Sequence, residues 1–246
     1  MKDQITSEIR KLTTTRSAYW LLAGLALVVA FTSASVVGAD QMTTNLDAPL
    51  ERQPFLVFPL TVTTVFTMIL GIRSFTDEFR YGSIVPTFLA SPDRRRVLGA
   101  KLVAVAAASV VYAVAAFGTA IAVGSVGLAI QGGDLTWSTG ALGTMGGYLV
   151  VASVLWAGIG LGVGLAVRHQ LAAIVGMFVW SLVVESALGA LVPGVARFLP
   201  DAAGSAIVGV DAANLLAPGV AVAVLAGWTA LATVVGGRLM QRRDVA

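Results

Sequence analysis

The run LVAVAAASVVYAVAAFGTAIAVGSVGLAI, residues 102–130, contains no charged side chain and decides the class of fold. A bilayer core about 30 Å thick is crossed by roughly 20 apolar residues in a helix, so this run is long enough to span it. A strand of a membrane barrel would alternate polar and apolar residues, and this run does not alternate. The run therefore predicts a transmembrane helix that tilts, kinks or extends beyond the lipid.

Five further apolar runs predict five more transmembrane helices. They are residues 19–38, 54–72, 140–167, 171–192 and 218–237, and only the run 171–192 contains a charge, Glu185. Apolar residues make up 57% of the chain and charged ones 12%, whereas about a quarter of a soluble domain is charged. We expect an all-α integral membrane protein with one transmembrane domain, residues 1–246. The first run is longer than a typical signal-peptide core, so we expect it to be retained.

The distribution of Lys and Arg sets the expected orientation. With the N-terminus placed in the cytoplasm, every Lys and Arg except Arg52 and Arg197 falls on the cytoplasmic side of the six spans. Cytoplasmic loops of membrane proteins carry such an excess of Lys and Arg. We therefore expect both termini in the cytoplasm. The formal charge of +3 follows from this orientation, and nucleic acid is not an expected partner.

Residues 1–18 are expected to form an amphipathic helix on the inner membrane surface. Ile5, Ile9 and Leu12 recur at helical spacing, while Glu8 and Lys11 point to another side. The apolar side of such a helix lies in the lipid boundary, so membrane lipids are expected partners. A solvated N-terminal extension is the alternative.

Residues 74–100 form the longest cytoplasmic loop, within the stretch RSFTDEFRYGSIVPTFLASPDRRRVLGAK from Arg73 to Lys101. We expect Thr76 to begin a short helix by capping its N-terminus, and Gly82 to end that helix in the left-handed conformation. Residues 84–90 are apolar but too short to span a membrane. On the residues alone, they form either a docking surface for another protein or a helix that lies on lipid headgroups.

Residues 193–217 form the longest outer segment, and Pro and Gly interrupt its apolar residues. One or two short helices at the outer leaflet, or a re-entrant segment, are expected there. At 1.5 Å per residue, Glu185 lies about 10 Å below the outer end of the preceding span. An acidic group inside lipid is costly. Glu185 is therefore either a structural group, protonated or paired with Arg197, or a residue that lines a transport path.

Several kinds of chemistry have no basis in this sequence. The chain contains no cysteine, and its one histidine, His169, lies between two spans. No stretch matches the phosphate-binding pattern G-x-x-x-x-G-K-[ST], so the chain is not expected to hydrolyse ATP. An ion-driven carrier usually places several ionisable groups in its spans, and here Glu185 is the single candidate. We assign no catalytic, cofactor-binding or metal-binding residue.

Glycines on the span 140–167 predict close helix packing, because small residues at a spacing of four allow two backbones to approach. The pairs at this spacing are Gly143 with Gly147, Gly158 with Gly162, and Gly160 with Gly164. We expect them to pack within the subunit, with a dimer interface as the lesser alternative.

Three stretches carry a resemblance to a known family. They are SEIRKLTTTRSAYWLL at residues 7–22, the loop residues 78–83 with 91–95 and Lys101, and residues 180–200. The chain resembles the membrane subunits of the ABC type-2 transporter family, especially the small six-span permeases of bacterial drug and antimicrobial-peptide exporters. The second stretch resembles the family pattern of Glu, Arg, Gly-Thr, Pro, Arg and Lys, with Ser83 in place of the threonine.

The resemblance implies a partner and a mechanism. In that family the loop between the second and third spans holds a coupling helix, which sits in a groove of a separate cytoplasmic ABC ATPase. Two ATPase copies, which bind ATP and magnesium, would act on this chain and a second permease subunit, identical or homologous, in the bacterial cell membrane. The residues implied to couple to the ATPase are Asp77, Glu78, Arg80, Phe88, Leu89, Arg94 and Arg95.

Two other functions stay open at this point. The chain is a non-transporting membrane anchor or regulatory subunit that uses the same loop, or an ion-driven secondary carrier. If it transports, the apolar spans favour a lipophilic or amphipathic cargo such as a drug, an antimicrobial peptide or a lipid.

Overall fold

A computed structural model of the chain describes residues 2–38, 54–83, 93–130, 139–208 and 215–242, together with Pro86 and Leu89. The described residues form helices and turns and contain no strand. The helices are α1 (Lys2–Thr14), α2 (Arg16–Gly38), α3 (Pro54–Arg80), α5 (Arg94–Ile130), α6 (Thr139–Val167), α7 (Gln170–Val179), the π-helix η2 (Trp180–Glu185), α8 (Ser186–Leu191), α9 (Pro193–Ala196), α10 (Pro200–Ile207) and α11 (Pro218–Arg242).

Six helices of the described residues are long and apolar enough to cross a membrane. They are α2, α3, α5, α6, the continuous run from α7 to α8, and α11. Each matches one of the apolar runs identified in the sequence, and the run 171–192 extends one residue past the end of α8 at Leu191. The all-helical membrane class is therefore confirmed at the level of length and composition.

Two of these helices extend well past their apolar runs. α3 continues to Arg80 and α5 begins at Arg94, so much of the expected loop is helical. The expectation that Thr76 begins a new helix is wrong, because its hydroxyl donates a hydrogen bond to the Ile72 carbonyl inside the continuous α3. The expected stop at Gly82 is confirmed, since α3 ends just before it and its φ is 67°.

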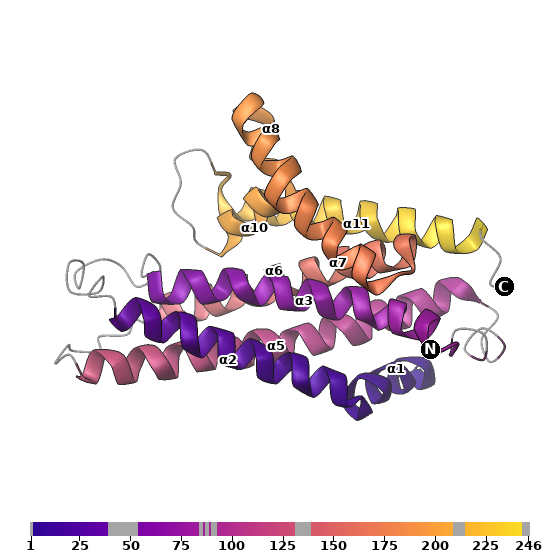
Figure 1. Cartoon of the computed structure of the whole chain (residues 1–246), viewed down its shortest axis with the longest axis horizontal. Coiled ribbons are helices and arrows are strands. Elements are labelled where there is room, and N and C mark those ends of the chain that lie inside the picture. Colours follow the sequence, from indigo (N-terminus) through magenta and orange to yellow (C-terminus); the bar gives the residue numbers. More distant parts are fainter. Residues whose placement is uncertain are drawn as a thin grey trace.

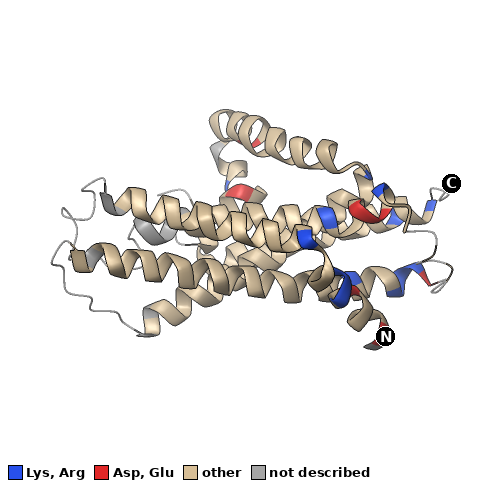
Figure 2. Cartoon of the chain, turned by 60° about the horizontal axis from the view of Figure 1, so that its bottom comes forward, with Lys and Arg blue, Asp and Glu red and all other residues tan. Residues whose placement is uncertain are grey.

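The long helices lie alongside one another, and both chain termini are at the same end of the bundle (Figure 1). Lys and Arg gather at that end (Figure 2), which we call the basic end. The run from α7 to α8 departs from this arrangement and rises obliquely from the bundle (Figure 1). α7 packs on α3 and α6, and α10 packs mainly on α11.

α6 lies between α3 and α11 and contacts both through glycines. An added Cβ at Gly160 would lie 2.1 Å from the Met68 carbonyl oxygen of α3, and one at Gly162 would lie 2.4 Å from the Ala232 backbone of α11. The two glycine pairs nearer the basic end therefore pack within the subunit, as expected. The third pair does not, since nothing lies within 4 Å of an added Cβ at Gly143 or Gly147.

Candidate functional site

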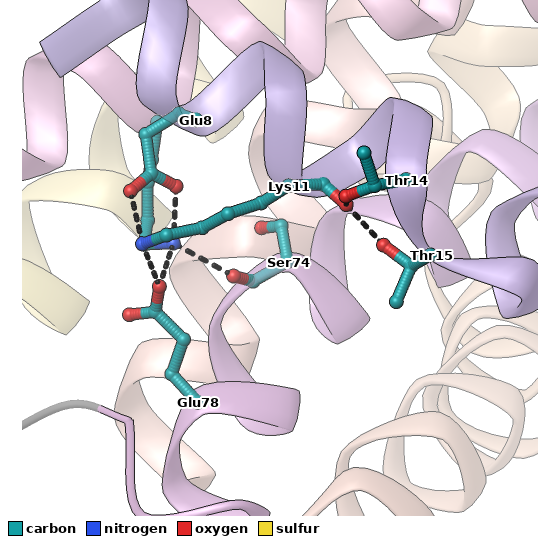
Figure 3. A network of polar contacts seen from close by, with 7 residues as sticks. Glu8, Lys11, Thr14, Thr15, Ser74 and Glu78 are labelled. Carbon is teal, nitrogen blue, oxygen red and sulfur yellow. Dashed lines mark hydrogen bonds and ion pairs between the residues drawn. The ribbon is translucent and has the colours of Figure 1, made fainter.

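Four charged side chains from three helices meet at the basic end (Figure 3). Lys11 Nζ lies 2.6 Å from Glu8 Oε1 and 2.7 Å from Glu78 Oε1. Lys101 Nζ lies 2.6 Å from Glu8 Oε2 and 2.8 Å from Glu78 Oε1. Two ammonium groups and two carboxylates thus alternate in a closed ring, which we call the four-charge ring. It joins α1 to the end of α3 and the beginning of α5.

Burial of three of its four side chains makes this ring unlike a surface ion pair, while the side chain of Lys11 is 42% exposed. The side chain of Lys101 is 2% exposed, and those of Glu8 and Glu78 are 10% and 7% exposed. Burying a charge is costly unless it is paired and hydrogen-bonded. Lys101 satisfies both conditions, because its Nζ also donates to the Ser74 carbonyl at 3.0 Å and lies 5.3 Å from the ring centroid of Phe75.

The ring also shifts the pKa of two of its members, Glu8 and Lys11. Burial raises the pKa of Glu8, but the attraction of Lys101 and Lys11 outweighs it and leaves that pKa below its usual value. Burial lowers the pKa of Lys11, but hydrogen bonds to Glu78 and Glu8 outweigh it and leave that pKa above its usual value. Both groups are therefore held in their charged forms.

A cavity of about 270 Å³ adjoins the ring, between α1, α2, α3 and α5. A second ion pair borders it, in which Arg73 Nη2 lies 3.2 Å from Asp77 Oδ2. Arg73 also donates to the Ser17 carbonyl of α2 at 3.5 Å. α1, α2, α3 and α5 are thus connected by polar contacts at the basic end.

The expected coupling residues do not form one cluster. Glu78 lies in the four-charge ring and Asp77 pairs with Arg73, while the Arg80 guanidinium lies 5.6 Å from the ring centroid of Tyr81. Leu89 is 79% exposed, and Phe88 lies outside the described residues.

Arg94 and Arg95 lie at the start of α5. Arg94 Nη1 donates to the Met240 carbonyl of α11 at 2.9 Å. The backbone N–H of Arg95 donates to Asp93 Oδ1 at 3.0 Å, and its side chain is exposed. The side chain of Arg95 is thus available at the surface, whereas Arg94 joins two helices.

Sequence reasoning missed Glu8, Lys11 and Lys101 as members of the site. The helical pattern assigned Glu8 only to a side of α1 other than its apolar stripe, yet Glu8 is buried and Ile9 of that stripe is 38% exposed. A signal for one member of the ring was present, because Lys101 directly precedes the long apolar run 102–130. Glu8 and Lys101 are 93 residues apart, so no local pattern in the sequence predicts their contact.

A second polar cluster joins the fifth span to α10. Glu185 accepts hydrogen bonds from Trp180 Nε1 at 2.8 Å and from the Asp201 backbone N–H at 3.0 Å. The Ser181 hydroxyl donates to the Asp201 carboxylate. The suggested pairing of Glu185 with Arg197 is wrong, because the Arg197 guanidinium lies over the Phe198 ring at 5.0 Å and no ion pair of the described residues joins it to Glu185.

His169 has a local structural role. It is exposed and precedes α7, and its Nδ1 accepts from the Ala172 backbone N–H at 3.3 Å. Within the described ranges, no group of three or more His, Asp or Glu side chains is placed to hold a metal ion. Comparison with protein-family models and with curated proteins finds no match.

Proposed function

We propose that the chain is the membrane-spanning permease subunit of an ABC exporter, which forms the substrate path and is driven by a separate cytoplasmic ATPase. The support comes from the six membrane-length helices, the gathering of Lys and Arg at the end with both termini (Figure 2), and the resemblance of residues 78–101 to the family's loop. The basic end is then the cytoplasmic side of a bacterial cell membrane.

The four-charge ring is the observation that carries this proposal. Glu78 and Lys101 are the first and last residues of the family-like loop pattern, and their charged atoms lie 2.8 Å apart. The segment between them therefore begins and ends at one buried point, to which Glu8 and Lys11 fasten α1. A push on this segment would reach α1, α3 and α5 together.

The finer architecture follows from the same proposal. α1 lies along the inner leaflet and contacts lipid on its exposed side. The segment that contains Pro86 and Leu89 makes the coupling contact with the ATPase, and α9 with α10 forms the outer re-entrant segment. Two permease subunits, identical or homologous, pair with two ATPase copies, whose ATP and magnesium supply the energy for moving a lipophilic or amphipathic cargo.

Co-purification tests the class of function. The full chain, isolated in mild detergent from its native host, is expected to bring down an ATPase whose hydrolysis rises when cargo is added. Absence of any ATPase among the bound proteins would contradict the proposal. A bound ATPase that shows no cargo-dependent turnover or transport in vesicles would favour the membrane-anchor alternative.

The coupling surface has its own test. Arg95→Glu is expected to lower cargo-stimulated ATP hydrolysis at least fivefold while the complex still assembles in the membrane, because Arg95 is exposed next to the proposed coupling segment. Arg242→Glu is the control, since it reverses an exposed charge at the same end on α11. Equal hydrolysis in the two variants would contradict this placement of the contact.

A further inference from the structure

A second cavity, of about 220 Å³, lies away from the four-charge ring, between α3, α6, the fifth span and α10. Its wall includes the aromatic side chains of Trp156, Phe178 and Trp180, and the polar side chains of Thr64, Ser181 and Asp201. α3, α6 and the fifth span are membrane-length helices, so this mixed lining is set in surroundings that otherwise favour apolar side chains.

The charge at this cavity is unbalanced. Asp201 lines it, and Glu185 bonds to the Asp201 backbone N–H at 3.0 Å. No Lys or Arg nitrogen in the described parts of the chain pairs with either carboxylate; their partners are the Ser181 hydroxyl, the Trp180 indole and backbone. At the four-charge ring, by contrast, each carboxylate has two ammonium partners. Glu185 is buried and Asp201 is half-buried, and a negative charge shielded from water without a counter-ion favours a cation.

An unsatisfied hydrogen-bond donor is present at the same wall. Trp156 is 6% exposed, and its indole N–H has no acceptor among the described residues. α10 approaches this N–H closely, since an added Cβ at Gly204 would lie 2.6 Å from Nε1. Most buried donors have an acceptor, so an oxygen of a bound ligand would supply the acceptor that the Trp156 indole N–H lacks.

We propose that this cavity binds an amphipathic organic cation that carries a hydrogen-bond acceptor. The Asp201 carboxylate holds the cationic group, and the rings of Trp180 and Phe178 contact it through their faces, which attract cations. The Trp156 indole N–H donates to the ligand's oxygen. The naming of such cations as the transported cargo rests on the proposed function. Binding of the cation to the cavity does not, and it can be measured on the isolated chain.

A pair of ligands tests the charge requirement on the unaltered protein. Benzoylcholine has an aromatic ring, an ester oxygen and a quaternary ammonium, and 3,3-dimethylbutyl benzoate differs from it only in a carbon at the nitrogen position. Binding to the full chain in detergent is measured by quenching of tryptophan fluorescence, with partition into protein-free micelles subtracted. We expect saturable binding of benzoylcholine at least tenfold tighter than of the neutral ester. Equal affinities, or no saturable binding, would overturn the proposal.

Two substitutions locate the site. Asp201→Asn removes the charge with little change of shape and is expected to weaken benzoylcholine at least tenfold and the neutral ester less than twofold. Asp3→Asn removes the same charge at an exposed position of α1 and is expected to change neither. Trp156→Phe keeps a ring and removes the N–H, so both ligands should weaken about threefold. An unchanged affinity of Asp201→Asn for benzoylcholine would overturn the cation site. An unchanged affinity of Trp156→Phe would overturn the assigned hydrogen bond.

The two proposals fail separately. If benzoylcholine binds as described but stimulates no associated ATPase, the cavity stands and the cargo assignment falls. If an ATPase is stimulated by other compounds while benzoylcholine does not bind, the exporter proposal stands and the cavity proposal falls.

Discussion

Lys101 is the residue whose removal should affect the basic end most. Its ammonium separates two buried carboxylates, so Lys101→Met leaves Glu8 and Glu78 with Lys11 alone as a counter-ion. Removing one partner of a buried ion pair typically costs about 3–5 kcal/mol. We expect a loss of this size in the free energy of unfolding, measured by titration with SDS in mixed micelles.

An exposed ion pair provides the matched control. Arg96 pairs with Asp93 at 3.0 Å, but the two side chains are 68% and 49% exposed. Surface pairs contribute about 0–1 kcal/mol, so Arg96→Met should change stability by no more than that. If the two variants lose the same stability, the four-charge ring does not hold the helices together.

The attachment of α1 is expected to depend on pH. The folded pKa of Glu8 is lowered, although burial opposes this, because Lys101 and Lys11 attract its charge. Stability from Glu8 is therefore present above its unfolded pKa and lost as pH falls through the folded value. The pKa of Lys11 is raised, against the effect of burial, by Glu78 and Glu8, so its contribution is present below its unfolded pKa and lost as pH rises through the folded value.

These signs predict that α1 is firmly docked near neutral pH and released in acid, below the usual range of glutamate. The chain has no cysteine, so a single nitroxide label at Arg10→Cys reports the mobility of α1 by electron paramagnetic resonance. Its spectrum should sharpen on acidification. A label at Arg242→Cys should show no such change over the same range, and equal changes at both positions would indicate general unfolding instead.

At the scale of the elements, the contact between α3 and α6 depends on glycine. A Cβ at Gly160 would lie 2.1 Å from the Met68 carbonyl oxygen, so Gly160→Ala must separate the two backbones. Overpacking of this kind costs about 1–3 kcal/mol. In the same helix, Gly147→Ala meets nothing within 4 Å and should stabilise by up to about 1 kcal/mol through helix propensity. SDS unfolding of both variants measures the difference, and a stabilised Gly160→Ala would contradict the packing.

The sequence predicts the spans well because hydropathy is a local property. Charge contacts between helices join residues that are far apart in the chain, so the sequence did not predict the four-charge ring. The sequence predicts that the loop begins near Arg73, since charged residues usually end a span. In the structure, Glu78 and Lys101 neutralise each other, and α3 and α5 both continue past their apolar runs. Glu185 was recognised as an unusual intramembrane acid, yet its contact with Asp201 arises only when α10 folds back beside the fifth span.

For the whole molecule, the remaining question is which way the bundle faces. Lys and Arg gather at the end with both termini (Figure 2), and such an excess marks the cytoplasmic side. Single cysteines at Arg10 and Arg95 should therefore resist a membrane-impermeant maleimide in intact cells and react after permeabilisation. A cysteine at the exposed Arg197 should react without permeabilisation. Labelling of Arg95→Cys from outside would reverse the orientation, and an ATPase in the cytoplasm could then not reach the segment between Glu78 and Lys101.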